Sequence, residues 1–399
     1  MKMVKTFRMT LSCVLLSLPF AGCDNGSTTV DSSHDSNRQV SLSATTMRSS
    51  IVDGDEVLSE GAFKVLAWQR DSTEVSSGVF TYTDNLWVGT QTDGGDYLPE
   101  TVWFQGASGG QKPWATLPTY YWPDTFVACD FYAIYPTTAP NIEELPREGS
   151  ARPVRYIDYD NNDRQTDLLL AATTTNSAQA AADALAAGGT DGMAKLLFHH
   201  VLTRVSFKAQ RDTQTPGPQL NVTVKSVELC NIRQIGTFKF QNLPNSPGDA
   251  PLLGIWSLRG SYKDLMLYND ATGVTLTDAE TAYTLTDATT SATLIPQQLT
   301  GWDITQTINE NNSLATPGTY LKIGCTITID GYEGNFVDGG YVYVPFNANL
   351  TMNKHYEYTL HFGGGYDRNG HLILQPVYIT NTVVPWATAI SEDIDPGWL

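Results

Sequence analysis

The chain is constrained most by short runs in which apolar and polar residues alternate and which are separated by Gly-, Pro- and Asn-containing segments. In residues 356–362, apolar side chains occupy every second position, and Glu, Thr and His fill the positions between them. Such alternation is typical of a β-strand with one buried face and one wet face. Comparable runs recur at 196–207, 222–229, 236–240, 321–329, 341–345, 371–375 and 377–384. Strands at this spacing favour antiparallel β-sandwiches over parallel α/β units, so the sequence predicts an all-β fold.

The length of the chain predicts two antiparallel β-sandwich domains in tandem. At about 150 residues per domain, a single elongated sandwich does not account for 399 residues as well as two do. The Ala-rich segment 176–187 is the stretch with helix propensity, and Gly188 and Gly189 would end such a helix. We place the boundary just beyond it, which gives an N-terminal β-sandwich domain at 39–190 and a C-terminal β-sandwich domain at 191–399.

The first residues have the pattern of an export signal. Lys2, Lys5 and Arg8 precede an apolar run at 11–20. That run is shorter than the roughly 20 residues that a membrane-spanning helix needs, and small residues follow it, as signal cleavage requires. We therefore predict that residues 1–22 are a signal peptide.

The signal ends in a motif that is similar to the lipobox of bacterial lipoproteins, Ala-Gly-Cys23. The motif implies cleavage before Cys23 and acylation of its thiol, with ordinary secretion and cleavage nearby as the alternative. Residues 24–38 are polar and turn-rich, with little to bury. The sequence thus predicts a lipidated flexible tether at 23–38.

The charge of the chain argues against a nucleic-acid partner. Lys and Arg total 24 against 42 Asp and Glu, a formal net charge of -18, and no basic block offers phosphates a contact surface. Hydrophobic residues make up 41% and aromatic residues 11%, which is too apolar for a disordered chain. We expect an acidic, folded protein that binds no nucleic acid.

Enzyme motifs lack the context that their chemistry requires. Residues 106–110, around Ser108, fit the Gly-x-Ser-x-Gly pattern of a nucleophile elbow, but no helix follows and further Gly and Pro residues indicate a loop. Nothing in the spacing of the many acidic residues selects a pair for glycoside hydrolysis. The prediction is that the protein is not an enzyme.

Metal and cofactor signals are equally weak. His199 and His200 are adjacent in a strand and point to opposite faces, so they cannot easily share a metal ion. Residues 158–163 supply oxygen ligands of the kind that calcium prefers but lack the glycine and glutamate of an EF-hand loop. A solvated acidic loop is the simpler interpretation, so we predict no metal site and no cofactor.

Three cysteines remain after the tether, namely Cys129, Cys230 and Cys325. They are widely spaced, three cannot pair completely, and none forms a Cys-x-x-Cys motif. We expect them to be buried as small hydrophobic residues.

An aromatic-rich stretch in the first half has two interpretations. Trp114 and Tyr120 could stack on sugar rings, or they could fill a sandwich core. Large aromatic side chains usually supply packing area, which favours the core. Sugar stacking by Trp114 and Tyr120 remains the alternative.

Short motifs in a fixed order carry a family resemblance. They are Tyr-Trp-Pro at 121–123, Asp-Phe-Tyr-Ala-Ile-Tyr-Pro at 130–136, Asp-Leu-Leu-Leu-Ala at 167–171, and further motifs at 197–205, 294–299, 356–360 and 384–386. Behind a lipobox-like signal, this series resembles the fimbrillin family, the lipoprotein pilus subunits of Gram-negative anaerobes. The resemblance covers nearly the whole chain. It implies two transthyretin-like β-sandwich domains and a lipid-anchored precursor on the outer membrane that enters a fimbria after processing.

The resemblance also implies a mechanism, which is strand exchange coupled to proteolysis. A trypsin-like surface protease would cut after Arg48, which follows a predicted first strand that places Val40, Leu42 and Ala44 on one face. Loss of that strand would expose backbone groups and an apolar groove that a strand of another subunit could fill. Arg38 is the alternative cut site, where cleavage would release the lipid and keep the strand.

The partners implied by the resemblance are other fimbrial subunits, the protease, the outer membrane and a host glycan or protein receptor. The donor strand is open: residues 371–384 have suitable alternation but equally suit a closing strand of the second domain. Stalk, tip and anchor roles are likewise open. A monomeric surface lipoprotein that binds glycan or host protein without polymerising is the alternative function.

Overall fold

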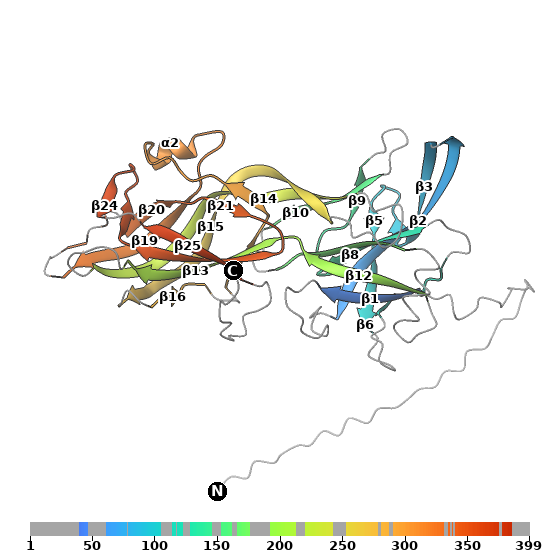
Figure 1. Ribbon diagram of the computed structural model, residues 1–399, viewed down its shortest axis with the longest axis horizontal. Coiled ribbons are helices and arrows are strands. Elements are labelled where there is room, and N and C mark those ends of the chain that lie inside the picture. Colours follow the sequence, from blue (N-terminus) through green and yellow to red (C-terminus); the bar gives the residue numbers. More distant parts are fainter. Residues whose placement is uncertain are drawn as a thin grey trace, which may run out of the picture. The chain divides into compact units, whose positions relative to one another are not determined.

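The computed structural model describes residues 40–46, 61–77, 79–104, 114–116, 118–122, 128–145, 153–161, 166–175, 192–212, 220–241, 253–277, 281–286, 290–330, 334–335, 337, 340–374 and 377–384 (Figure 1). These residues form β-strands almost throughout, and they all fall within one unit that runs from Asn37 to Leu399. The all-β prediction is therefore confirmed.

The first sheet has eight strands. They are β1 (Val40–Thr46), β2 (Ala62–Ser76), β3 (Val79–Val88), β6 (Glu100–Phe104), β7 (Trp114–Thr116), β8 (Ala128–Tyr135), β11 (Leu169–Thr175) and β12 (Gly192–His200). Seven of them pair in a closed ring in the order β2-β6-β7-β1-β12-β11-β8, because β8 also pairs with β2. The ring encloses an apolar core that includes Leu42, Phe63, Phe131 and Phe198. The strand β3 pairs with β2 outside the ring.

The second sheet also has eight strands, and the third has five. The second contains β9 (Glu143–Leu145), β10 (Val154–Asp160), β14 (Leu220–Phe240), β15 (Gly254–Leu276), β19 (Tyr320–Ile329), β20 (Tyr341–Pro345), β23 (Gly364–Tyr366) and β24 (Leu372–Leu374). The third contains β13 (Thr203–Arg211), β16 (Tyr283–Thr284), β17 (Ala292–Leu294), β22 (Lys354–Phe362) and β25 (Tyr378–Val384). One core joins the two sheets, with Phe207 and Tyr358 from the third packed together with Val224 and Ile323 from the second. This is the layered arrangement of a β-sandwich.

The remaining elements are short. The pairs β4 (Thr90–Gln91) with β5 (Tyr97–Leu98) and β18 (Gln297–Leu299) with β21 (Ala348–Leu350) form two-stranded sheets. The helix α2 (Ile308–Asn312) begins at Thr307, whose side chain and that of Glu310 form a capping box. The predicted helical segment 176–187 lies outside the described residues.

A further core connects the first sheet with the second. Leu66, Trp68 and Tyr132 on the outer face of the ring pack in one cluster with Ile157 and Phe238 of the second sheet. The chain also passes between the sheets more than once, since β10 precedes β12 in sequence but pairs with β14. The sheets therefore do not divide at residues 190/191, and the division into domains at 39–190 and 191–399 stays a prediction.

Pairing differs from the sequence prediction in two respects. Most strands pair antiparallel, as expected, but β1 pairs with β12 and β13 with β22 in parallel. The predicted single strand at 196–207 is broken at Val201 and Leu202. Both residues are fully buried in the connecting core, where the chain leaves the first sheet and enters the third. Tertiary packing thus divides a run whose local pattern is continuous.

Candidate functional site

The strand β1 is a structural part of the ring, and it is the first strand that the structure describes (Figure 1). The side chains of Val40 and Leu42 are 6% and 2% exposed, and the partly buried Ala44 packs against the same core. The predicted alternation of Val40, Leu42 and Ala44 is thereby confirmed as the core face of a strand. Full burial of an aliphatic side chain contributes about 1.5–3 kcal/mol relative to exposure, so this strand stabilises the ring considerably.

The two sides of β1 are held unequally. On one side, all seven residues from Val40 to Thr46 align in parallel with 192–198 of β12. On the other side, a single pair among the described residues, Leu42 with Trp114, aligns β1 with β7, and the Val40 amide donates to the Tyr120 carbonyl at 2.9 Å. Without β1, the main edge left unpaired would therefore be that of β12.

The structure corrects the alternative assignment of Trp114. Its side chain is 7% exposed, and its ring centroid lies 5.1 Å from that of Phe63 inside the ring. A buried indole offers no face to a sugar, so Trp114 has a packing role. Tyr120 is partly buried against the same core, and its hydroxyl donates to Glu100 Oε1 at 2.8 Å. Burial and then this hydrogen bond raise the pKa of Tyr120. Sugar stacking by Tyr120 stays a prediction.

The sequence motifs come together in polar contacts, one buried and one partly buried. Asp130, the first residue of the motif at 130–136, is fully buried and faces the Arg70 guanidinium at 2.9 Å. The Thr174 hydroxyl donates to the same carboxylate at 2.6 Å. Asp167, which opens the motif at 167–171, is bonded to His200 of the motif at 197–205. These polar motif residues therefore connect β2, β8, β11 and β12.

A second buried cation lies between the first and second sheets. The Arg155 guanidinium is 3.8 Å from the ring centroid of Trp68 and 5.3 Å from that of Tyr132. It also pairs with Asp84 at 3.3 Å and Glu144 at 3.1 Å. Sequence reasoning missed this cluster, although a signal exists, since Arg155 shares the strand phase of the buried Ile157 and Tyr159.

A buried histidine on the third sheet predicts a pH dependence of stability. Burial, followed by the charge of Arg204, lowers the pKa of His355 from 6.5 to about 4, against the opposing effect of Glu357. The unfolded chain therefore binds one more proton than the folded chain between these values. The free energy of unfolding should fall by up to about 3 kcal/mol as pH drops through this window. Urea unfolding at pH 7 and pH 4.5 measures the change.

A matched pair of variants assigns this pH dependence. His355→Gln removes the titrating group, which lies 2.9 Å from the Ser206 hydroxyl, and should flatten the pH profile between 6.5 and 4. The control is Asn381→Gln, because Asn381 is an exposed residue without a titratable group on the neighbouring strand, and this variant should keep the wild-type profile. Equal pH profiles for His355→Gln and the wild type would contradict the assignment.

Of the predicted acidic loop at 158–163, residues 158–161 are described, and 158–160 belong to the strand β10 rather than to a loop. Asp158 and Asn161 have partners within the protein. Asp158 accepts a hydrogen bond from Thr237 at 2.6 Å and pairs with Arg259 at 2.7 Å. The Asn161 amide is buried and donates to the Thr293 carbonyl at 2.6 Å. Among the described residues, no group of three His, Cys, Asp or Glu side chains is arranged to hold a metal ion.

The predicted cysteine environment is confirmed. Cys129, Cys230 and Cys325 are all buried and form no disulfide. Burial is the largest cause that raises the pKa of each thiol. Thiolate chemistry at neutral pH is therefore disfavoured at all three sites.

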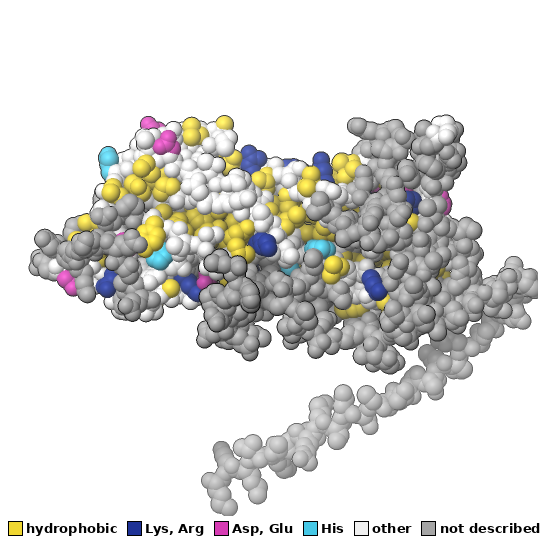
Figure 2. All heavy atoms as spheres, in the orientation of Figure 1, with side chains coloured by type: hydrophobic (Ala, Val, Ile, Leu, Met, Phe, Trp, Pro, Cys, Tyr) yellow, Lys and Arg dark blue, Asp and Glu magenta, His cyan; other side chains and the backbone are white. Residues whose placement is uncertain are grey.

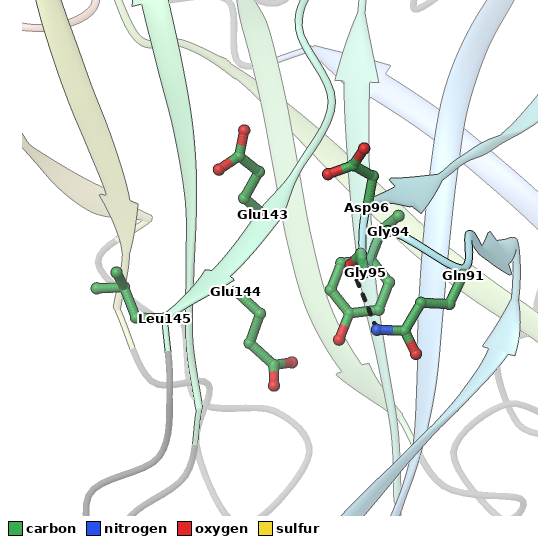
Figure 3. A pocket seen from close by; sticks show the side chains of 8 residues that line it. Gln91, Gly94, Gly95, Asp96, Glu143, Glu144 and Leu145 are labelled. Atoms are coloured by element: carbon green, nitrogen blue, oxygen red, sulfur yellow. Dashed lines mark hydrogen bonds between the residues drawn. The ribbon is translucent and has the colours of Figure 1, made fainter.

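One cavity of about 300 Å³ lies between the β4–β5 hairpin and β9 (Figure 3). Its acidic side chains are Asp96 from the hairpin and Glu143 and Glu144 from the strand. Glu144 forms an ion pair with Arg155, and Glu143 accepts a hydrogen bond from Tyr156. Gln91 donates to the Gly95 carbonyl at 3.3 Å within the hairpin. The cavity is acidic, and two of its three carboxylates already have partners in the protein.

The distribution of basic side chains on the face shown agrees with the lack of a basic block in the sequence. In Figure 2, the Lys and Arg side chains of the described residues are scattered singly over the face shown.

In the part of the chain that the structure describes, no helix combines the length and apolar character needed to cross a bilayer. The predicted lipidation site Cys23 and the predicted cut sites Arg38 and Arg48 lie outside the described residues. Ser108, for which no catalytic role is predicted, also lies outside them.

Part of the possible donor segment 371–384 pairs with a strand of its own chain in this structure. The strand β25 pairs antiparallel with β22, from Tyr378 opposite His361 to Val384 opposite His355. It is the edge of the third sheet, and most of its side chains are exposed. Its partly buried Ile379 packs against the core between the second and third sheets.

Together, these features define an all-β protein with a closed ring of strands, a β-sandwich and a first described strand that completes the ring. The chain belongs to the fimbrillin-like family, whose model matches residues 55–386. No curated protein matches the chain.

Solved structures of low identity are similar to the chain. A fimbrial protein from Bacteroides vulgatus ATCC 8482 is 13% identical, with a TM-score of 0.46 over 88% of this chain and 100% of that one. A protein described as a cell adhesion protein, from Bacteroides uniformis ATCC 8492, is 14% identical, with a TM-score of 0.37 over 88% and 99%. The tip fimbrial protein Mfa3 from Porphyromonas gingivalis is 10% identical, with a TM-score of 0.30 over 82% and 94%.

Proposed function

We propose that the chain is the precursor of a structural and adhesive subunit of a fimbria, exported to the cell surface as a lipoprotein. Membership of the fimbrillin-like family supports the fimbrial role. The observation that carries the assembly mechanism is the position of β1, which contributes core residues to the ring and is joined to β2 through residues 47–61. Arg48 lies in that connection. One cut there would disconnect a core strand without breaking any other strand that the structure describes.

Assembly then follows from the pairing of β1. A trypsin-like protease cuts after Arg48, and β1 leaves with Val40 and Leu42, which exposes the paired edge of β12 and the apolar interior of the ring. A strand of another subunit that enters this groove recovers backbone hydrogen bonds and apolar burial together. No cofactor takes part in this step.

The precursor is held at the outer membrane by a lipid on Cys23. The polar tether that follows separates the folded part from the membrane and contains Arg38, the alternative cut site. Cleavage at Arg38 would release a soluble chain that keeps β1, and cleavage at Arg48 a subunit competent for assembly.

Mass spectrometry of the N-terminus, on protein recovered from the cell surface, tests this function. We expect the chain in high-mass assemblies to begin at Ser49, with an acylated Cys23 start in the unprocessed precursor. Material that is monomeric and begins at acylated Cys23 in every fraction would exclude a stalk role. A Gln39 start in soluble monomers would identify Arg38 as the processing site.

A monomeric surface lipoprotein that binds glycan or host protein is the second candidate. It is favoured by two large aromatic side chains of the first half that are exposed, Trp103 at 50% and Tyr121 at 46%. Binding to a glycan or host protein that is lost in Tyr121→Ala, with an unchanged circular dichroism spectrum and no high-mass assemblies, would favour this role.

A further inference from the structure

Removal of β1 would open the ring between β7 and β12. The core inside the ring contains Phe63, whose ring centroid is 5.1 Å from that of Trp114 and 5.2 Å from that of Phe198. When apolar side chains that line an open groove close on one another and exclude water, the free energy of the protein falls. A groove that receives a new strand therefore needs a wall that resists this collapse.

The wall across the ring from β1 is formed by β2 and β8, which pair with each other over seven residues. Its outer face presents Leu66, Trp68, Tyr132 and Ile134 to the core shared with the second sheet. The wall is thus covered on both faces, by the core of the ring on one side and by the shared core on the other.

Arg155 connects this wall to the second sheet by contacts in several directions. From β10, its guanidinium lies over Trp68 of β2 and near Tyr132 of β8, at 3.8 and 5.3 Å from the ring centroids. Asp84 of β3 and Glu144 of β9 accept from the same terminal nitrogen. The side chains of Arg155 and Asp84 are each 1% exposed. A planar cation in such a site cannot shift without separating from a buried carboxylate.

We propose that Arg155 is a positioning residue that holds the β2–β8 wall in place when β1 leaves, and so keeps the groove open for an incoming strand. The inference rests on the strand exchange proposed above. The shared apolar core resists separation of the sheets but is not directional, whereas the stacked and paired guanidinium fixes the wall in one orientation. Loss of this orientation would let the wall move toward β12 and narrow the groove.

The test uses the full chain with a site for a sequence-specific protease placed within residues 49–60. The chain is cut in its folded state, and uptake of a fluorescent peptide with the sequence of residues 39–48 is followed by anisotropy. We expect the cut wild type to take up the peptide. Cut Arg155→Lys should bind the peptide with an affinity at least about tenfold lower. The control is Arg233→Lys, since Arg233 also lies over an aromatic ring, Tyr262 at 4.7 Å, but outside the ring of strands. It should bind like the wild type.

Equal peptide affinity for Arg155→Lys and the wild type would overturn the proposal. A purely structural role would lower the urea midpoint of the uncut variant and leave the peptide affinity of the cut chain unchanged. If Arg155→Lys fails to fold, the double variant Arg155→Met, Asp84→Asn removes both buried charges and takes its place.

A failure of strand exchange itself has a different signature, because the cut wild type would then take up no peptide. Hydrogen exchange at residues 192–198 in the same cut samples would still decide the role of Arg155. A wall that closes toward β12 covers its edge, so slower exchange in Arg155→Lys than in the wild type supports the proposal, and equal or faster exchange overturns it.

Discussion

Replacement of Asp130 by Ala should lower the free energy of unfolding by about 3–5 kcal/mol, as the removal of one partner from a buried ion pair usually does. The Asp130 carboxylate is fully buried, pairs with Arg70 at 2.9 Å and accepts from the Thr174 hydroxyl at 2.6 Å. Without it, the Arg70 guanidinium, itself 1% exposed, would lose the carboxylate it faces. Urea unfolding followed by tryptophan fluorescence measures the loss.

Two controls separate charge from packing at this site. Asp93→Ala removes an exposed carboxylate from the β4–β5 hairpin and should change stability by less than about 0.5 kcal/mol. The double variant Asp130→Leu, Arg70→Met removes both charges and should recover much of the stability that Asp130→Ala loses. If Asp130→Ala unfolds at the same urea concentration as Asp93→Ala, the buried pair does not hold the ring together.

Replacement of Leu42 by Ala should cost about 2–5 kcal/mol, the range for buried leucines. The side chain is 2% exposed and lies inside the ring. The backbone of Leu42 is paired with that of Trp114 in β7. The variant keeps the backbone pairing of β1 and loses apolar contact, so β1 should also leave a cut chain more readily. The urea midpoint of the uncut chain measures the loss of stability. The fraction of the β1 segment that stays bound after the chain is cut measures its release.

Ser43 provides the matched control for Leu42. It is the next residue of the same strand and points to the opposite face, where it is partly exposed. Ser43→Ala should stay within about 0.5 kcal/mol of the wild type. An equally small effect of Leu42→Ala would mean that β1 contributes little to the core, and the insertion of a strand from another subunit would lose the apolar burial that drives it.

Local pattern accounts for what could be predicted of the fold. Alternation is a property of neighbouring residues, and it correctly indicated the strand at 40–46 with its core face and the paired run at 356–362. The capping box of α2 was also visible, as Thr307 and Glu310 three residues apart, but five residues of helix have too weak a periodic signal to be recognised.

Buried charge was harder to predict, because the partner determines whether a charged residue is inside. Arg70 follows Leu66 and Trp68 in strand phase, and Arg155 precedes Ile157 and Tyr159, so both stand at core positions of their strands. Their carboxylate partners Asp130 and Asp84 lie 60 and 71 residues away along the chain. No local pattern connects such residues.

The all-β class, the strand faces and the family motifs could be predicted, since each depends on residues a few positions apart. The parallel pairing of β1 with β12, the closure of seven strands into a ring and the burial of Trp114 became evident in the folded chain alone. The pairing of β1 with β12 joins segments about 150 residues apart, and it is set by the total burial and hydrogen bonding of the closed ring. That sum belongs to the whole fold and has no counterpart in any short stretch of sequence.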